Sequence, residues 1–223
     1  MRIGFSHDSF ISANLPDPSQ VETVHCEITS GLFRPGLFII TDPMKHGILV
    51  GFGFMGGMHA QIYAQIPEAE IVAVADPDLE AAGAKLADLG MTAALYSSLG
   101  DALEHADADF VDICLPTFAH KEATLQAIAA GKAVFCEKPL ATHAEDGSAM
   151  VAAAEAAGIT LMVGHCIRFW PELVALKVLV ESGRAGKLLN LTLQRRSARP
   201  ADSVENWLQD AAKSKGAALD LHI

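Results

Sequence analysis

The feature that most constrains this chain is an apolar run at residues 47–50 that leads into Gly51, Gly53 and Gly56. This order predicts a strand, a tight turn and a helix. In a nucleotide-binding βαβ unit, Gly51 permits the turn and Gly53 lets the backbone approach a pyrophosphate, while Gly56 lets the helix pack closely on the strand. The N–H groups at the start of the helix would then face the phosphates, where the helix dipole favours negative charge.

A second apolar run at residues 71–75 ends in Asp76 and strengthens this interpretation. An acidic side chain at the end of the second strand accepts hydrogen bonds from the hydroxyl groups of the adenosine ribose. Asp76 could also act as a turn or helix-capping residue, and the two roles are compatible. Residues 77–84 contain no Arg or Lys to meet a 2′-phosphate, so NAD is favoured over NADP. We therefore predict cofactor contacts from Phe54, Met55 and Asp76 in addition to the three glycines.

The composition is that of a globular protein, since 51% of the 223 residues are hydrophobic and 19% are charged. The net charge of −11 argues against a nucleic acid partner. No run of about 18 uncharged apolar residues predicts a membrane span, and the N-terminus lacks the apolar centre of a secretory signal. The four cysteines form no Cys-x-x-Cys pair, which is typical of a cytoplasmic protein without a metal centre; they are Cys26, Cys114, Cys136 and Cys166.

Three segments differ in their patterning. Residues 1–43 hold four of the ten prolines and show no sustained period, so they are either an upstream extension of the reading frame or a real arm over a sheet edge or subunit contact. Strand and helix patterns alternate over residues 44–164, which is typical of an α/β fold with a doubly wound parallel Rossmann sheet. The predicted strands are 47–50, 71–75, 92–96, 110–115, 133–136 and 160–164, and the predicted helices between them include 79–89, 98–105, 119–130 and 143–157.

From residue 165 onward the pattern changes. A helix is predicted to run to about Glu181, and residues 187–198 alternate apolar and polar side chains as a half-buried strand does. We expect residues 165–223 to be part of an α+β domain with an antiparallel sheet. The 59 residues of this segment are too few to complete such a domain.

Five motifs, read in order, resemble the Gfo/Idh/MocA oxidoreductases, and the resemblance covers about residues 45–223. No single motif is specific, but their order is. They are the glycine loop at 51–60, Leu115-Pro116-Thr117-Phe118-Ala119-His120, Glu137-Lys138-Pro139, the segment 164–171 and the segment 216–220. Such proteins act on sugars, inositols and related polyols with NAD or NADP. The resemblance therefore implies hydride transfer between a nicotinamide and a secondary alcohol.

The resemblance also implies roles for residues that follow the fourth and fifth strands. Lys138 would hydrogen-bond the reacting hydroxyl and accept its proton, although a Lys after a strand is ordinarily a solvated surface residue. Glu137 and Lys138 would lie beside the nicotinamide, and the proline that follows them is often cis in such folds. Pro116, Thr117 and His120 would lie over the cofactor's ribose and nicotinamide, with Thr117 alternatively a helix cap.

Two residues are implied by the later motifs. Arg168 would fix Glu137, contact the cofactor or form a structural ion pair. Asp220 matches a family Asp that stands four residues before a catalytic His, so we place Asp220 among the catalytic residues. That His would fall at position 224, after Ile223, and His222 does not have the spacing to replace it. We therefore expect a chain truncated in its second domain that binds NAD but turns over poorly.

The resulting hypothesis is an NAD-dependent dehydrogenase of a sugar, inositol or related polyol. Two alternatives stay open. One is a non-catalytic dinucleotide-binding fragment or sensor, and the other is a relative that uses NAD to assist glycoside cleavage or that reduces non-sugar substrates. At full length we expect a homo-oligomer, formed through the open face of the second sheet.

Overall fold

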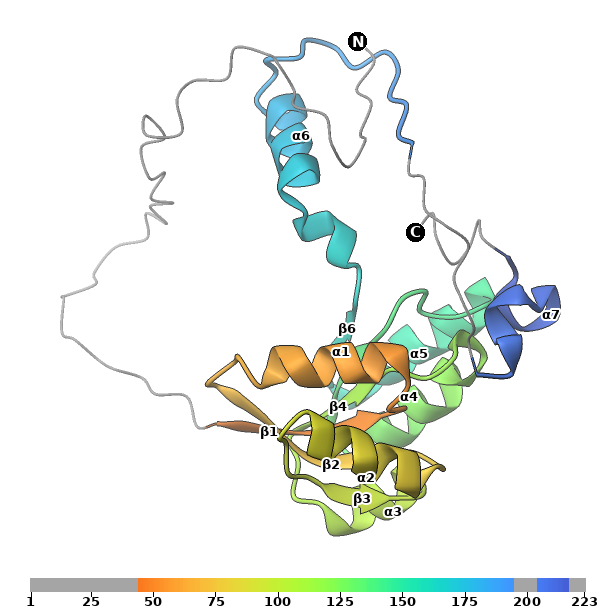
Figure 1. Cartoon of the computed structure of the whole chain (residues 1–223). Coiled ribbons are helices and arrows are strands. Elements are labelled where there is room, and N and C mark those ends of the chain that lie inside the picture. Colours follow the sequence, from red (N-terminus) through yellow and green to blue (C-terminus); the bar gives the residue numbers. More distant parts are fainter. Residues whose placement is uncertain (1–43, 195–203, 217–223) are drawn as a thin grey trace, which may run out of the picture. The chain divides into compact units, whose positions relative to one another are not determined.

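The computed structural model describes residues 44–194 and 204–216, which belong to two compact units. Of the described residues, 44–178 and 204–216 belong to one unit and 179–194 to the other. Figure 1 shows the described residues coloured along the chain. The predicted N-terminal extension 1–43 and the predicted catalytic residue Asp220 lie outside the described residues.

A six-stranded parallel sheet forms the centre of the larger unit, in the order β3-β2-β1-β4-β5-β6. From β1 the chain winds outward to β3, then returns to β4 beside β1 and winds outward in the other direction. This is the doubly wound order of a Rossmann sheet, and it confirms that part of the predicted fold class. The strands are β1 (Lys45–Val50), β2 (Ala69–Ala75), β3 (Ala94–Tyr96), β4 (Phe110–Ile113), β5 (Ala133–Cys136) and β6 (Leu161–Val163).

The helices begin and end at residues whose chemistry favours those ends. The Asp78 side chain accepts the N–H of Ala81 at the start of α2, and Gly158 ends α5 with a φ of 65°, which a glycine adopts without strain. The helices and 3-10 turns are α1 (Phe54–Tyr63), α2 (Leu79–Asp88), α3 (Leu99–His105), η2 (Thr117–Ala119), α4 (His120–Ala129), α5 (Ala144–Ala157), η3 (Cys166–Phe169), α6 (Pro171–Glu181), η4 (Val204–Gln209) and α7 (Ala211–Ser214).

The two faces of the sheet have separate apolar cores. On one face Leu49 and Val74 pack with Ala60 of α1 and Leu86 of α2. The other face packs against α3, α4 and α5, and its core includes Ile48, Val111, Ala102, Ala127 and Met150. Because successive strand residues point to opposite faces, the apolar run of β1 serves both cores.

The predicted strand at 187–198 is not present in the part that the structure describes. Residues 187–194 have no regular secondary structure and are exposed, and 195–198 lie outside the described residues. The pattern of the segment suits a half-buried strand, but a strand needs a neighbour for its backbone N–H and C=O groups, and no described segment pairs with it. Among the described residues, no helix is long and apolar enough to cross a membrane.

Candidate functional site

The glycine loop between β1 and α1 is tight at two of its three glycines. Gly51 has a φ of 83°, and a Cβ there would lie 2.9 Å from the Cys114 carbonyl oxygen. A Cβ on Gly56 would lie 2.1 Å from the Gly51 carbonyl oxygen. At Gly53 a Cβ would meet no atom within 4 Å. The loop is therefore compact on its inner side, and Gly53 borders open space.

Asp76, which follows β2, holds this loop in place. One carboxylate oxygen accepts the N–H of Phe52 at 2.7 Å, and the other accepts the N–H of Asp78 at 2.9 Å. A carboxylate oxygen has two lone pairs, so both oxygens keep capacity for a further donor. The structure thus gives Asp76 a local role in shaping the loop, and a contact with the ribose stays a prediction.

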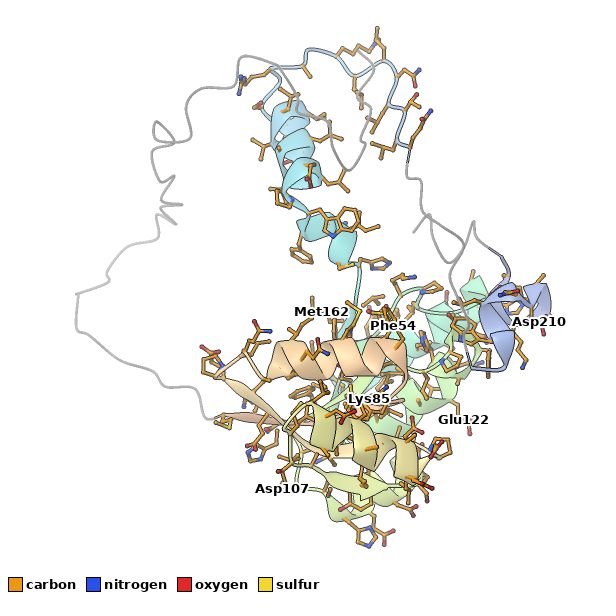
Figure 2. The ribbon with its side chains drawn as sticks, viewed as in Figure 1. Phe54, Lys85, Asp107, Glu122, Met162 and Asp210 are labelled. Atoms are coloured by element: carbon orange, nitrogen blue, oxygen red, sulfur yellow. The ribbon has the colours of Figure 1, made fainter. Side chains whose placement is uncertain are left out.

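Lys85 is a residue at this loop that the sequence pattern did not reveal. Its Nζ donates to the carbonyl oxygens of Phe52 and Gly53, at 2.5 and 2.9 Å. The sequence contains no cation at residues 77–84, and Lys85 is the next residue of α2. Only the packing of α2 beside α1 brings its side chain to the loop. In Figure 2 Lys85 lies between these two helices.

Three predicted cofactor residues follow β4, and the structure distinguishes them. Pro116 is half-buried and precedes η2, whereas Thr117 is buried. His120 is fully buried, with Nδ1 2.9 Å from the Pro139 carbonyl oxygen and Nε2 2.8 Å from that of Leu115. Burial lowers the pKa of His120. Because both ring nitrogens already face carbonyls, His120 joins two loops at this end of the sheet, and this geometry favours an indirect part in cofactor binding.

The Glu137-Lys138-Pro139 segment follows β5 at the same end of the sheet. Glu137 is buried, and its Oε2 accepts the N–H of Lys138 at 3.0 Å. A Cβ on Gly164 would lie only 3.1 Å from Glu137 Oε1, so the small residue after β6 makes room for this carboxylate. The Lys138–Pro139 peptide bond is cis, as the family resemblance implied. The catalytic role of Lys138 stays a prediction.

His59 links this segment to the interior of the sheet. Its Nδ1 lies 2.8 Å from Asp112 Oδ2, and its Nε2 lies 3.2 Å from Glu137 Oε1. Burial by itself lowers the pKa of His59, but hydrogen bonds with Asp112, Cys114 and Glu137 and the charge of Asp112 raise it to about 12. The ring is therefore an imidazolium at neutral pH. It compensates the charge of Asp112, which is fully buried in β4.

The same residues have the spacing of a metal site. Donor atoms of His59, Asp112 and Cys114 all lie within 4.8 Å of one another. Within residues 44–194 and 204–216, no other group of three His, Cys, Asp or Glu side chains has this spacing. The atoms already have partners, because Cys114 Sγ lies 3.3 Å from His59 Nδ1 and 3.6 Å from Asp112 Oδ1. Burial raises the pKa of the Cys114 thiol to about 12, which keeps it protonated. We describe the group as a hydrogen-bonded ion cluster.

The raised pKa of His59 predicts a pH-dependent contribution to stability. The pKa of His59 is about 12 in the folded protein and about 6.5 in the unfolded chain. The protonated ring therefore contributes its full stabilisation of the fold below pH 6.5, and this stabilisation falls as the pH rises towards 12. We expect the stability advantage of the wild type over His59→Gln to shrink between about pH 6 and pH 9, by at most about 1.4 kcal/mol per pH unit. Urea unfolding of both proteins across that range measures it.

The matched control for this measurement is His105→Gln, because His105 is exposed on α3. This substitution should leave the pH slope of the wild type unchanged. If the free energy of unfolding depends on pH in the same way for the wild type and His59→Gln, His59 has the same pKa in the folded and unfolded states.

The remaining predicted residues differ in their place relative to the site. Arg168 is exposed on η3 and has no ion pair within the described residues, so the predicted bond to Glu137 is not formed. Phe54 is 80% exposed at the start of α1, and Met55 beside it is half-buried, so both border the open side of the glycine loop.

The segment 204–216 packs beside η2, although it is distant in sequence. The Trp207 ring meets the Phe118 ring edge-on at 6.4 Å, and Lys213 Nζ lies 5.8 Å from the centre of the Phe118 ring. These contacts cover part of the loop that follows β4. No sequence pattern predicted these contacts, since an exposed aromatic residue on a short 3-10 turn has many possible partners.

A doubly wound sheet whose first strand enters a three-glycine loop, with an acid at the end of the second strand, defines a Rossmann dinucleotide-binding protein. The model of the oxidoreductase family with an NAD-binding Rossmann fold, Gfo/Idh/MocA, matches residues 45–165, which is more than half of the chain. The chain belongs to this family, as the five motifs indicated.

Relatives of known activity include sugar and inositol dehydrogenases. The chain is 37% identical to inositol 2-dehydrogenase of Klebsiella pneumoniae over 76% of its own length and 50% of that protein. It is 31% identical to levoglucosan dehydrogenase of Pseudarthrobacter phenanthrenivorans over 78% of its own length and 47% of that protein. The chain thus spans about half the length of the curated relatives it matches.

Solved structures of the family have the same fold. The WlbA dehydrogenase of Bordetella pertussis, in complex with NADH and UDP-GlcNAcA, is 36% identical and superposes with a TM-score of 0.62 over 66% of this chain and 42% of that one. The scyllo-inositol dehydrogenase of Lactobacillus casei, with bound NAD(H) and scyllo-inositol, is 27% identical with a TM-score of 0.60 over 64% and 42% of the two chains.

Proposed function

We propose that this chain contains the cofactor-binding part of an NAD-dependent dehydrogenase that acts on a secondary alcohol of a sugar, inositol or related polyol. The proposal rests on family membership together with one geometric observation. The glycine loop after β1 and the Glu137-Lys138 segment after β5 lie at the same end of the sheet, on either side of β4. In doubly wound sheets this end, at the switch between β1 and β4, is where ligands bind.

The loop has the features that a pyrophosphate requires. Within the described residues, the N–H groups of Gly53, Phe54 and Met55 have no hydrogen-bond acceptor, and the space at Gly53 is open. Free N–H groups at a helix start attract anions, and the α1 dipole adds to this attraction. Asp76, at the end of β2, suits the ribose hydroxyls and disfavours a 2′-phosphate, so NAD is the preferred cofactor.

Bound NAD would supply the hydride acceptor, and the protein's residues would orient the substrate and take its proton. Lys138 is the proposed base, which hydrogen-bonds the alcohol hydroxyl and removes its proton as the alcohol becomes a ketone. Glu137 holds the backbone of Lys138 through its 3.0 Å bond to the Lys138 N–H. Asp220 is proposed to act with Lys138. Arg168 is proposed as a further contact of the cofactor.

Two further properties concern the compartment and the assembly of the protein. Cys114, Cys136 and Cys166 are free thiols, which suits a reducing cytoplasm. A homo-oligomer is proposed from the family resemblance, with small sugars or polyols as the expected partners of the site.

The test of the proposed function is a fluorescence titration with NADH, followed by a screen for substrate-dependent NADH formation at high protein concentration. We expect saturable NADH binding, weaker NADPH binding and turnover with at least one inositol or sugar. Binding without turnover of any polyol would favour a dinucleotide-binding sensor. Cleavage of aryl glycosides in the same screen would favour the NAD-assisted glycosidase.

A further inference from the structure

Lys85 makes three contacts with the glycine loop. Its Nζ donates to the carbonyl oxygens of Phe52 and Gly53, and it lies 5.2 Å from the centre of the Phe52 ring. Its stem runs beside Gly57, where an added Cβ would lie 3.4 Å from Lys85 Cδ. Bonds from an ammonium to carbonyl oxygens are charge-assisted and therefore strong. The side chain ties α2 to the loop that begins α1.

These two bonds fix the direction of two peptide groups. In a trans peptide the C=O and the N–H point in opposite directions. When Lys85 draws the Phe52 carbonyl towards α2, the N–H of Gly53 must point away from α2. The Gly53 carbonyl accepts both Lys85 Nζ and the N–H of Gly57, the latter at 3.1 Å, so Lys85 and the first turn of α1 together direct the N–H of Phe54.

Those are two of the N–H groups that have no acceptor within the described residues. The preceding N–H of the loop, on Phe52, is held on its inner side by Asp76. The loop is therefore held from two sides. Asp76, after β2, binds the N–H of Phe52, and Lys85, on α2, directs the N–H groups of Gly53 and Phe54 away from α2. Gly53, between those two outward groups, is the position where added bulk would enter open space.

We propose that Lys85 is a positioning residue for dinucleotide binding, which sets the orientation of the Gly53 and Phe54 N–H groups towards the pyrophosphate and adds a positive charge behind them. The inference rests on the proposed dinucleotide site and names a determinant of its affinity that lies outside the glycine motif. It assigns Lys85 no contact with the nicotinamide or the substrate.

The test compares Lys85→Met, Lys85→Arg and Lys132→Met for binding of NADH and of ADP-ribose, which lacks the nicotinamide. Lys132 is the matched control, because its Nζ also donates to a backbone carbonyl, that of Ala108, at 2.7 Å. That bond lies at the opposite end of the sheet, before β5. We expect Lys85→Met to raise both dissociation constants by a similar factor of about 5 to 20, since it removes two charge-assisted bonds. Lys85→Arg should stay within about threefold of the wild type, because the charge and donors remain.

The controls separate this inference from the proposed function. Lys132→Met should bind both ligands as the wild type does, and thermal unfolding should show that every variant is folded. If Lys85→Met does not fold, Lys85→Gln provides the same comparison, with an amide donor in place of the charge.

Three results would overturn the inference. If wild type and Lys85→Met bind NADH and ADP-ribose equally well, Lys85 does not set the loop. If Lys85→Met weakens binding of NADH but not of ADP-ribose, the effect lies at the nicotinamide, and the inference is also wrong. A wild type that binds neither ligand would overturn the proposed function, and the inference with it.

Discussion

Replacing Gly53 with alanine (Gly53→Ala) is expected to weaken NADH binding by about 10- to 100-fold without loss of stability. A Cβ at this position meets no protein atom within 4 Å, so the folded chain has room for it. The space it would enter is that proposed for the pyrophosphate, and overpacking of one methyl group costs about 1–3 kcal/mol. The measurement is an NADH titration beside a thermal unfolding curve.

Gly56→Ala provides the contrast. Its Cβ would lie 2.1 Å from the Gly51 carbonyl oxygen, so α1 must move away from the loop. This variant should lose both NADH affinity and thermal stability, since a backbone clash inside the fold cannot be relieved by a side-chain rotation. If Gly53→Ala bound NADH as tightly as the wild type, the pyrophosphate would not lie against Gly53, and the proposed orientation of the cofactor would be wrong.

Lys138→Met is expected to lower kcat for polyol oxidation by about 10²- to 10⁴-fold, the usual effect of removing a general base. The NADH dissociation constant should change by less than about threefold, because the proposed role of Lys138 is towards the substrate hydroxyl. The comparison requires steady-state rates with the substrate that the screen identifies, and NADH titrations of both proteins.

Lys138→Arg distinguishes charge from proton transfer. Arginine keeps the positive charge and the donors but does not release a proton near neutral pH. If Lys138 accepts the proton, this variant should be nearly as slow as Lys138→Met. Wild-type rates in Lys138→Met would remove Lys138 from catalysis and leave the chain as a dinucleotide-binding protein whose base lies elsewhere.

Much of the fold could be predicted because its signals are local. Gly90, Gly131 and Gly158 each adopt a positive φ near the end of a predicted helix. The predicted fourth strand continued to Leu115, whereas β4 ends at Ile113, because the chain leaves the ladder before Pro116. The strand predicted at 187–198 failed for another reason. Alternating side chains indicate a half-buried face, but strand formation depends on a partner that no described residue supplies.

The site was predicted in part. The glycines and Asp76 follow a motif whose spacing is set by one turn and one helix start, so sequence alone could predict their places in the loop, and their contacts with the cofactor stay a prediction. His120 was predicted over the cofactor, but its ring is occupied by two carbonyl groups from loops that the fold brings together. Lys85 was not predicted, because a Lys on a helix is ordinarily a solvated residue.

By itself, the sequence determined the strand–loop–helix unit, the acid at the end of the second strand, the alternation of elements and the family. These depend on steric and periodic rules that act over a few residues. Only the tertiary structure decided which side chains meet. His59 reaches Asp112 and Glu137, which lie 53 and 78 positions later in the chain. They meet because the doubly wound order places β4 between β1 and β5, and a pairing set by strand order leaves no trace in local sequence.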